Sequence, residues 1–151
     1  MAVRDALLGL YALMDTITDL QVVGIGAPEA LTHQVQGWVT LGELEQEVAA
    51  RTAGGPIEMR LNMICWFGYA VEGSENLAEL ELADFFGALT VKLAQNRRGT
   101  VSGVTVNLNG SVTELGLPRP ASVPSDYVRY AGQEARIQTL AVLVRLTQDV
   151  P

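Results

Sequence analysis

The clearest pattern in the sequence is an alternation of apolar and other residues between residues 57 and 71. The odd positions are all apolar or aromatic, whereas the even positions begin with Glu58 and Arg60. A period of two places alternate side chains on opposite faces, so the stretch predicts one long β-strand. Because the later even positions include Ile64 and Trp66, we expect the second half of the strand either to be covered on both faces or to leave the domain and meet a neighbour.

Two other stretches show the spacing of amphipathic helices, with apolar residues three or four positions apart. Residues 2–20 carry one such stripe and predict the first helix. Residues 76–96 carry the other, with glutamates near the beginning and Arg97 and Arg98 just after the end. This placement of charge complements the helix dipole and supports the second helix. We expect Gly99 to stop it.

The segment between the first helix and the long strand predicts shorter elements. Residues 21–33 are rich in turn formers and predict a loop with one short apolar strand. Residues 34–44 predict a strand, whereas residues 44–51 fit either a strand or a helical turn. The break at Gly54-Gly55-Pro56 makes this segment the partner of the long strand in a hairpin, which we expect to project from the body.

The C-terminal part predicts two strands separated by a loop. Residues 101–108 alternate as a strand and end in a tight turn at 109–111, while residues 112–134 contain three prolines and predict a long loop. Residues 136–147 predict a last strand, buried on both faces. The order of elements predicts a single domain with an α+β fold, a mostly antiparallel β-sheet with two helices packed on one face and a projecting β-hairpin.

Composition favours a protein that contacts other proteins over one that binds nucleic acid. The net charge is −7, which opposes affinity for phosphates. The apolar fraction of 48% and the mean hydropathy of +0.21 indicate apolar surface beyond one core. No stretch of 18 apolar residues predicts a membrane span, and no signal peptide is apparent, so we expect a cytosolic protein or a particle assembled in the cytosol.

Candidate catalytic, metal-binding and cofactor-binding residues are weak throughout the sequence. Cys65 is the single cysteine and lies on the apolar face of the long strand, where a small buried hydrophobe is the simplest reading. His33 is the single histidine and is expected to be an ordinary loop residue. Gly24 and Gly26 lack the third glycine of a dinucleotide fingerprint. We therefore predict no enzyme activity, no metal and no cofactor, and we interpret the acidic cluster as dipole-matched surface: Glu75, Glu79 and Glu81.

Four quoted segments carry a family resemblance: VRDALLGLYALMD, RLNMICWFGYAVEGSENLAELELADFFGALTVKLAQN, VSGVTVNLNG and DYVRYAGQEARIQTLAVLVRL. They give an N-terminal helix, a long strand entering an acidic-then-apolar helix, a strand after that helix, and an aromatic approach to the last strand. In these elements and in size, the chain resembles the tail terminator (tail completion) proteins of long-tailed non-contractile bacteriophages. The resemblance covers most of the chain as a pattern of elements.

The resemblance implies a virion structural protein of the tail, assembled in the host cytoplasm. Such proteins form a homo-oligomeric ring, with a hexamer expected, that stops tail-tube polymerisation and docks on the head connector. The partners implied are further copies of the chain, the tail-tube protein and a head-completion protein, while DNA passes through the lumen without specific binding. We expect the hairpin (about 36–71) and the proline-rich loop (about 112–130) to supply contacts, and the interface to include Trp38, Trp66, Tyr69, Tyr127, Arg129 and Tyr130.

Three alternatives remain open from the sequence. A head-completion or neck subunit shares the size, fold style and acidic charge. A small ligand-binding or enzymatic domain would use the polar groups of the segment DYVRY, where Arg129 could hold an anion. A protein-binding regulatory subunit is the third alternative.

Overall fold

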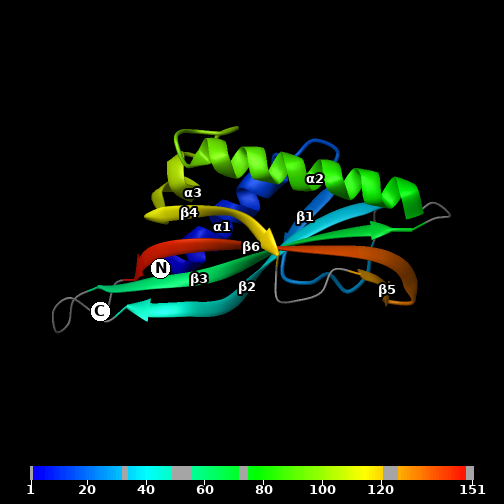
Figure 1. Cartoon of the computed structure of the whole chain (residues 1–151), viewed down its shortest axis with the longest axis horizontal. Coiled ribbons are helices and arrows are strands. Elements are labelled where there is room, and N and C mark those ends of the chain that lie inside the picture. Colours follow the sequence, from blue (N-terminus) through cyan, green and yellow to red (C-terminus); the bar gives the residue numbers. More distant parts are fainter. Residues whose placement is uncertain (1, 32–33, 49–55, 72–74, 121–125, 149–151) are drawn as a thin grey trace.

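The computed structural model describes residues 2–31, 34–48, 56–71, 75–120 and 126–148 (Figure 1). Along these residues the chain forms three helices and six strands. Their bounds are α1 Ala2–Asp15, β1 Val22–Ile25, β2 Val35–Val48, β3 Ile57–Ala70, α2 Glu75–Asn96, α3 Val106–Gly110, β4 Glu114–Pro120, β5 Asp126–Tyr130 and β6 Gln133–Gln148.

The six described strands form one sheet in the order β1-β2-β3-β6-β4, and β5 also pairs with β6. The β1–β2 pair is parallel and the other pairs are antiparallel. The predicted α+β fold with a mostly antiparallel sheet is therefore confirmed. Strands β2 and β3 form the predicted hairpin, whose distal ends extend to one end of the molecule (Figure 1).

The predicted long strand is confirmed as β3, which lies at the centre of the sheet. Cys65 is paired with Val39 of β2 on one side and with Leu140 of β6 on the other. The odd side chains of β3 from Leu61 to Tyr69 are buried in the main core together with the even side chains of β6 from Leu140 to Leu146. The period of two therefore decides which face of each strand the helices cover.

Both long helices pack on this face of the sheet (Figure 1). Helix α1 lies over β1 and β2, and α2 lies over β3 and β4. The first helix ends at Asp15 and not at residue 20 as predicted. The Thr16 hydroxyl donates a hydrogen bond to the Leu13 carbonyl at 2.7 Å, which offers the last turn an alternative to helix continuation. Ile17 and Leu20 still reach the core from the turn that follows.

A second, smaller apolar cluster lies on the other face of the sheet. It contains Leu31, Trp38, Ala135 and Ile137, with Trp66 and Tyr130 packed against it. Its two indole rings are stacked, with centroids 5.8 Å apart and planes 10° from parallel. The expectation that β3 is covered on both faces in its second half is confirmed at Ile64 and Ala70, whereas Trp66 is only partly buried.

The prediction of a strand over residues 101–108 is wrong. Val101 and Val104 form an isolated bridge, and the chain then enters the short element α3. Within α3, Asn107, Leu108 and Asn109 all have positive φ, between 52° and 61°. The alternation of Val104, Val106 and Leu108 in the sequence resembled a strand, but tertiary contacts impose a left-handed turn there.

The prediction of a long loop over residues 112–134 is also wrong, because this segment contains β4 and β5. Both strands pair with β6. Pro118 and Pro120 are tolerated because β4 is an edge strand that needs no further backbone partner on its outer side. Residues 44–48, left open between strand and helix, belong to β2. His33, residues 49–51 and Gly54-Gly55 lie outside the described residues.

Candidate interaction surfaces

The outward side of α2 is unusually apolar for an exposed helix. Its inner stripe, which includes Leu82, Leu89 and Leu93, is buried in the main core. On the remaining surface Leu80 is 66% exposed and Val91 is 54% exposed. A surface helix that packs on a core with one side is normally polar on the other. Exposed apolar surface of this kind marks a contact with another molecule.

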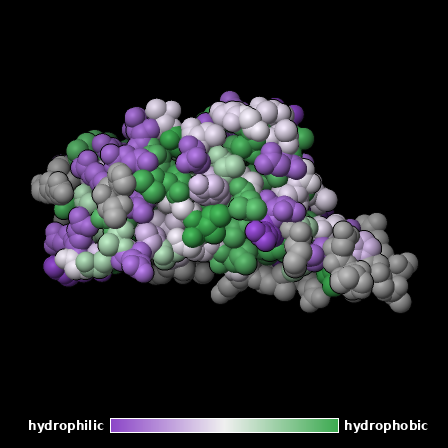
Figure 2. Space-filling model, turned by 180° about the vertical axis from the view of Figure 1, so that it is seen from behind, coloured by the Kyte–Doolittle hydropathy of each residue, from purple (hydrophilic) through white to green (hydrophobic). Residues whose placement is uncertain are grey.

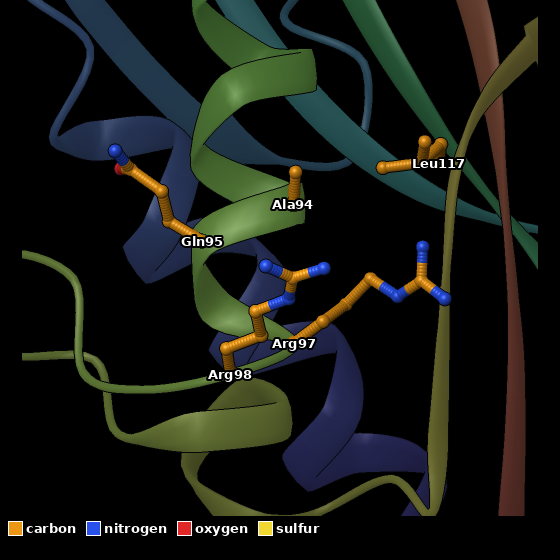
Figure 3. A pocket seen from close by; sticks show the side chains of 5 residues that line it. All are labelled: Ala94, Gln95, Arg97, Arg98 and Leu117. Carbon is orange, nitrogen blue, oxygen red and sulfur yellow. The ribbon is translucent and has the colours of Figure 1, made fainter.

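A basic groove lies between the C-terminal end of α2 and strand β4. It has a volume of about 560 Å³ and is lined by Ala94, Gln95, Arg97, Arg98 and Leu117. Figure 3 shows Arg97 extending across the groove toward β4, while the Arg98 guanidinium lies over the last turn of α2. Neither guanidinium has an acidic partner among the described residues. The groove therefore presents two uncompensated positive charges beside an exposed leucine.

An acidic hollow lies on the other side of α2, next to the turn that connects α1 to β1. It has a volume of about 380 Å³, and three of its lining side chains are carboxylates, set beside one lysine. The lining residues are Thr18, Asp19, Glu81, Asp84, Phe85, Ala88 and Lys92. With three negative charges and one positive charge, the hollow has the opposite sign to the basic groove.

The groove and the hollow lie on opposite sides of α2. The groove includes Leu117 of the outer strand β4, whereas the hollow lies between α2 and the turn that precedes β1. Exposed large apolar side chains accompany both edges: Ile25 and Leu41 near β1, and Leu117 near β4. Figure 2, which views the molecule from behind, shows an apolar patch near the middle of the visible face. The sheet edges thus carry exposed apolar groups, and the two sides of α2 carry opposite charge.

The predicted interface aromatics differ in how accessible they are. Trp38 is 2% exposed and Tyr69 is 1% exposed, so both side chains are buried by other residues of the same chain. Trp66 is half-buried, and its Nε1 donates a hydrogen bond to the Thr40 hydroxyl at 2.8 Å. We therefore retain Trp66, and not Trp38 or Tyr69, among the side chains with surface to offer a partner.

The three predicted residues of β5 lie close together but have separate partners. The Tyr127 hydroxyl donates to Glu79 Oε1 at 2.8 Å, and Arg129 Nη2 donates to the Gly132 carbonyl at 2.9 Å. The Tyr130 hydroxyl donates to the Pro28 carbonyl, and burial raises the pKa of Tyr130. Tyr127 and Arg129 are exposed, so β5 offers an accessible polar and aromatic surface.

Glu79 connects α2 to strands β5 and β6. Besides the Tyr127 hydroxyl, its Oε1 accepts a hydrogen bond from Arg136 Nε at 2.8 Å. These two hydrogen bonds, that from Arg136 first, lower the pKa of Glu79. The Arg136 guanidinium carbon also lies 5.4 Å from the centre of the Tyr127 ring. The sequence analysis treated Glu79 only as dipole-matched surface and missed this contact.

The chemical groups considered in the sequence give no reactive centre in the described structure. The Cys65 thiol is fully buried, and burial raises its pKa to about 12, which removes the thiolate at neutral pH. The described residues contain no group of three or more histidine, cysteine or acidic side chains placed to hold a metal. No described helix is long and apolar enough to cross a membrane.

Comparison with solved structures found a likeness in fold. No protein-family model matches the chain, and no curated protein matches it. The structure is similar to that of the sheath/tube terminator of an extracellular contractile injection system, PVC, determined by cryo-EM in the extended state. The TM-score is 0.46 and the sequence identity is 12%. The likeness covers 99% of this chain and 57% of the terminator chain. A likeness at this level does not by itself assign a function.

The basic groove and the acidic hollow were not predicted from the sequence. Arg97 and Arg98 were interpreted as complements of the helix dipole, and Leu117 was placed in a loop. A prediction that β4 pairs with β6 would have revealed the groove, because this pairing brings Leu117 beside the end of α2. The apolar outer positions of α2 were visible in the sequence and account for part of the apolar excess noted there.

Proposed function

We propose that the protein is a structural subunit of a virus tail. It assembles into a ring, expected to be a hexamer, at the head-proximal end of the tail, where it ends tail-tube polymerisation and joins tail to head. The observation that carries the proposal is the exposed apolar surface at both edges of the sheet, together with two surfaces of opposite charge on opposite sides of α2. A subunit of a cyclic ring needs two different contact patches, one on each side.

The position of this ring in the tail is inferred from the resemblance of the sequence to the tail terminator proteins. The partners are further copies of the chain, the tail-tube protein and a head-completion protein, and the host cytoplasm is the place of assembly. The net charge of −7 suits a ring through which DNA passes without binding. Restriction to non-contractile tails belongs to the proposal and rests on the sequence resemblance.

A structural role also agrees with the chemistry of the described side chains. The strongest nucleophile in the chain, Cys65, is buried and protonated. The surfaces with uncompensated charge lie on the two sides of α2 and include apolar groups, which is the composition of a protein interface. We therefore propose contact with protein partners as the role of these surfaces.

The experiment that tests the proposal measures tube length. The tail-tube protein of the virus that encodes this chain is polymerised with and without the purified chain, and tube lengths are measured by negative-stain electron microscopy. We expect shorter tubes that carry a ring at one end. Tubes of unchanged length without end rings would contradict the terminator role. Binding to head-completion proteins in that case would favour the neck-subunit alternative.

A further inference from the structure

We propose that the basic groove of one copy receives the acidic hollow of the next copy, so that the chain associates head to tail through these two surfaces. This inference rests on the proposed ring and names the surfaces that close it. The basic groove is the one lined by Arg97, Arg98 and Leu117, and the acidic hollow is the one lined by Asp19, Glu81 and Asp84.

The charges of the groove are available to a partner from outside the described part of the chain. Arg97 and Arg98 are both exposed, and the described residues provide no carboxylate for either. Leu117 is exposed on β4 within the same groove. A partner that fits this groove has an apolar contact with carboxylates beside it. Desolvated arginine–carboxylate pairs next to apolar groups are typical of specific interfaces.

The acidic hollow has that composition. Asp19, Glu81 and Asp84 provide carboxylates around Phe85 and Ala88, and Lys92 is the single cation in its lining. The net charge of its lining is −2, from three negative charges and one positive charge, against +2 from the two arginines of the groove. The two surfaces are therefore matched in charge magnitude and opposite in sign, which favours their encounter over other pairings.

The positions of the two surfaces favour a ring over a two-fold dimer. They lie on opposite sides of α2. A two-fold contact of groove against groove would oppose like charges, and a two-fold contact that pairs each groove with a hollow would have to cover both sides of α2 at once. A contact of groove against hollow is heterologous, and it leaves a free groove and a free hollow for further copies until the ring closes.

Charge reversal tests the inference without touching the core. R97E/R98E inverts the groove, and E81K/D84K gives the hollow three lysines against Asp19. Asp19 is left unchanged because its φ of 70° disfavours most replacements. Assembly is followed by native mass spectrometry over a range of concentrations. We expect each variant to need a concentration higher by about tenfold or more for half-assembly. The control R4E/R145E has the same change in net charge as R97E/R98E and should assemble as the wild type does.

Complementation then shows whether the two surfaces meet each other. An equimolar mixture of the two variants, or one chain that carries all four substitutions, should regain assembly because each inverted surface again faces its opposite. Rings of R97E/R98E at wild-type concentrations, or no rescue by the mixture, would overturn this inference and leave the ring itself intact. A wild-type chain that never self-associates, with or without the tube protein, would overturn the ring proposal as well.

Discussion

The side chain of Asn96 holds the backbone of Leu108 in a left-handed conformation. Asn96 Oδ1 accepts a hydrogen bond from the Leu108 N–H at 2.8 Å, and Leu108 has a φ of 52°. The Asn96 amide also donates to three carbonyls, those of Gly99, Val104 and Thr105. Both Asn96 and Leu108 are fully buried. One side chain at the end of α2 thus organises the whole connection to β4.

Replacing Asn96 should destabilise the fold markedly. Asn96→Ala leaves the buried Leu108 N–H without its partner and removes the donors to three carbonyls, at a cost of roughly 2–4 kcal/mol in the free energy of unfolding. Denaturant unfolding monitored by circular dichroism measures the loss. Gln95→Ala, at the exposed neighbouring position, is the control and should change stability by less than about 0.5 kcal/mol. Equal stability of the two variants would contradict this role of Asn96.

The close approach of α1 to Leu108 gives a second prediction. A Cβ added at Gly9 would lie 2.8 Å from the Leu108 Cβ, whereas one added at Gly87 of α2 would meet nothing within 4 Å. We expect Gly9→Ala to destabilise the protein by about 1–3 kcal/mol through overpacking. Gly87→Ala should stabilise it by roughly 0.5–1 kcal/mol, because alanine favours helix more than glycine does. Thermal unfolding of both variants tests the contrast, and a stabilising Gly9→Ala would refute it.

The contact between Glu79 and Arg136 predicts a pH dependence. Because the pKa of folded Glu79 lies below its ordinary value of 4.5, the carboxylate adds stability above that value and loses it as the pH falls through the lower folded pKa. Glu79 is half exposed, so solvent screening limits the contribution to about 1 kcal/mol or less.

Thermal melting from about pH 6 down to about pH 3 tests this contribution. Glu79→Gln should lower the melting temperature at the upper end of the range, and the difference from the wild type should shrink toward the lower end. Glu29→Gln, at an exposed position outside the groove and the hollow, is the control. A difference between Glu79→Gln and the wild type that stays constant with pH would show that the ion pair contributes nothing to the linkage.

The single cysteine reports on opening of the core. The Cys65 thiol is fully buried and its pKa is raised to about 12, so a thiol reagent at neutral pH should react only when the sheet opens. We expect labelling to be complete in denaturant and slower by orders of magnitude in the native protein. A native labelling rate close to that of the unfolded chain would contradict the packing of β3 between β2 and β6.

The elements with a strong internal period were the ones that the sequence could predict. β3, β6 and α2 each bury a regular stripe, so residue spacing alone identified them. The left-handed turn at α3 depends on hydrogen bonds from Asn96, a residue outside that turn. β4 was missed because its prolines exclude a central strand but not an edge strand, and edge position is a property of the assembled sheet.

The sequence indicated that the protein contacts other proteins, but it did not indicate which surfaces make the contacts. The apolar excess and the absence of a basic patch indicated protein contacts, and the accessible aromatics of β5 were identified by residue type. The burial of Trp38 and Tyr69 was not foreseen, because an aromatic residue in a strand fits a core as well as an interface. The opposite charges of the groove and the hollow come from side chains brought together by folding.

The mass of the purified protein tests the central claim most directly. Light scattering over a range of protein and salt concentrations, with negative-stain images of the same samples, gives the subunit number and shape. We predict rings of about six subunits with an open centre, weakened by salt because charged surfaces join them. A protein that stays monomeric at every concentration, and also in the presence of its tail-tube protein, would contradict the account.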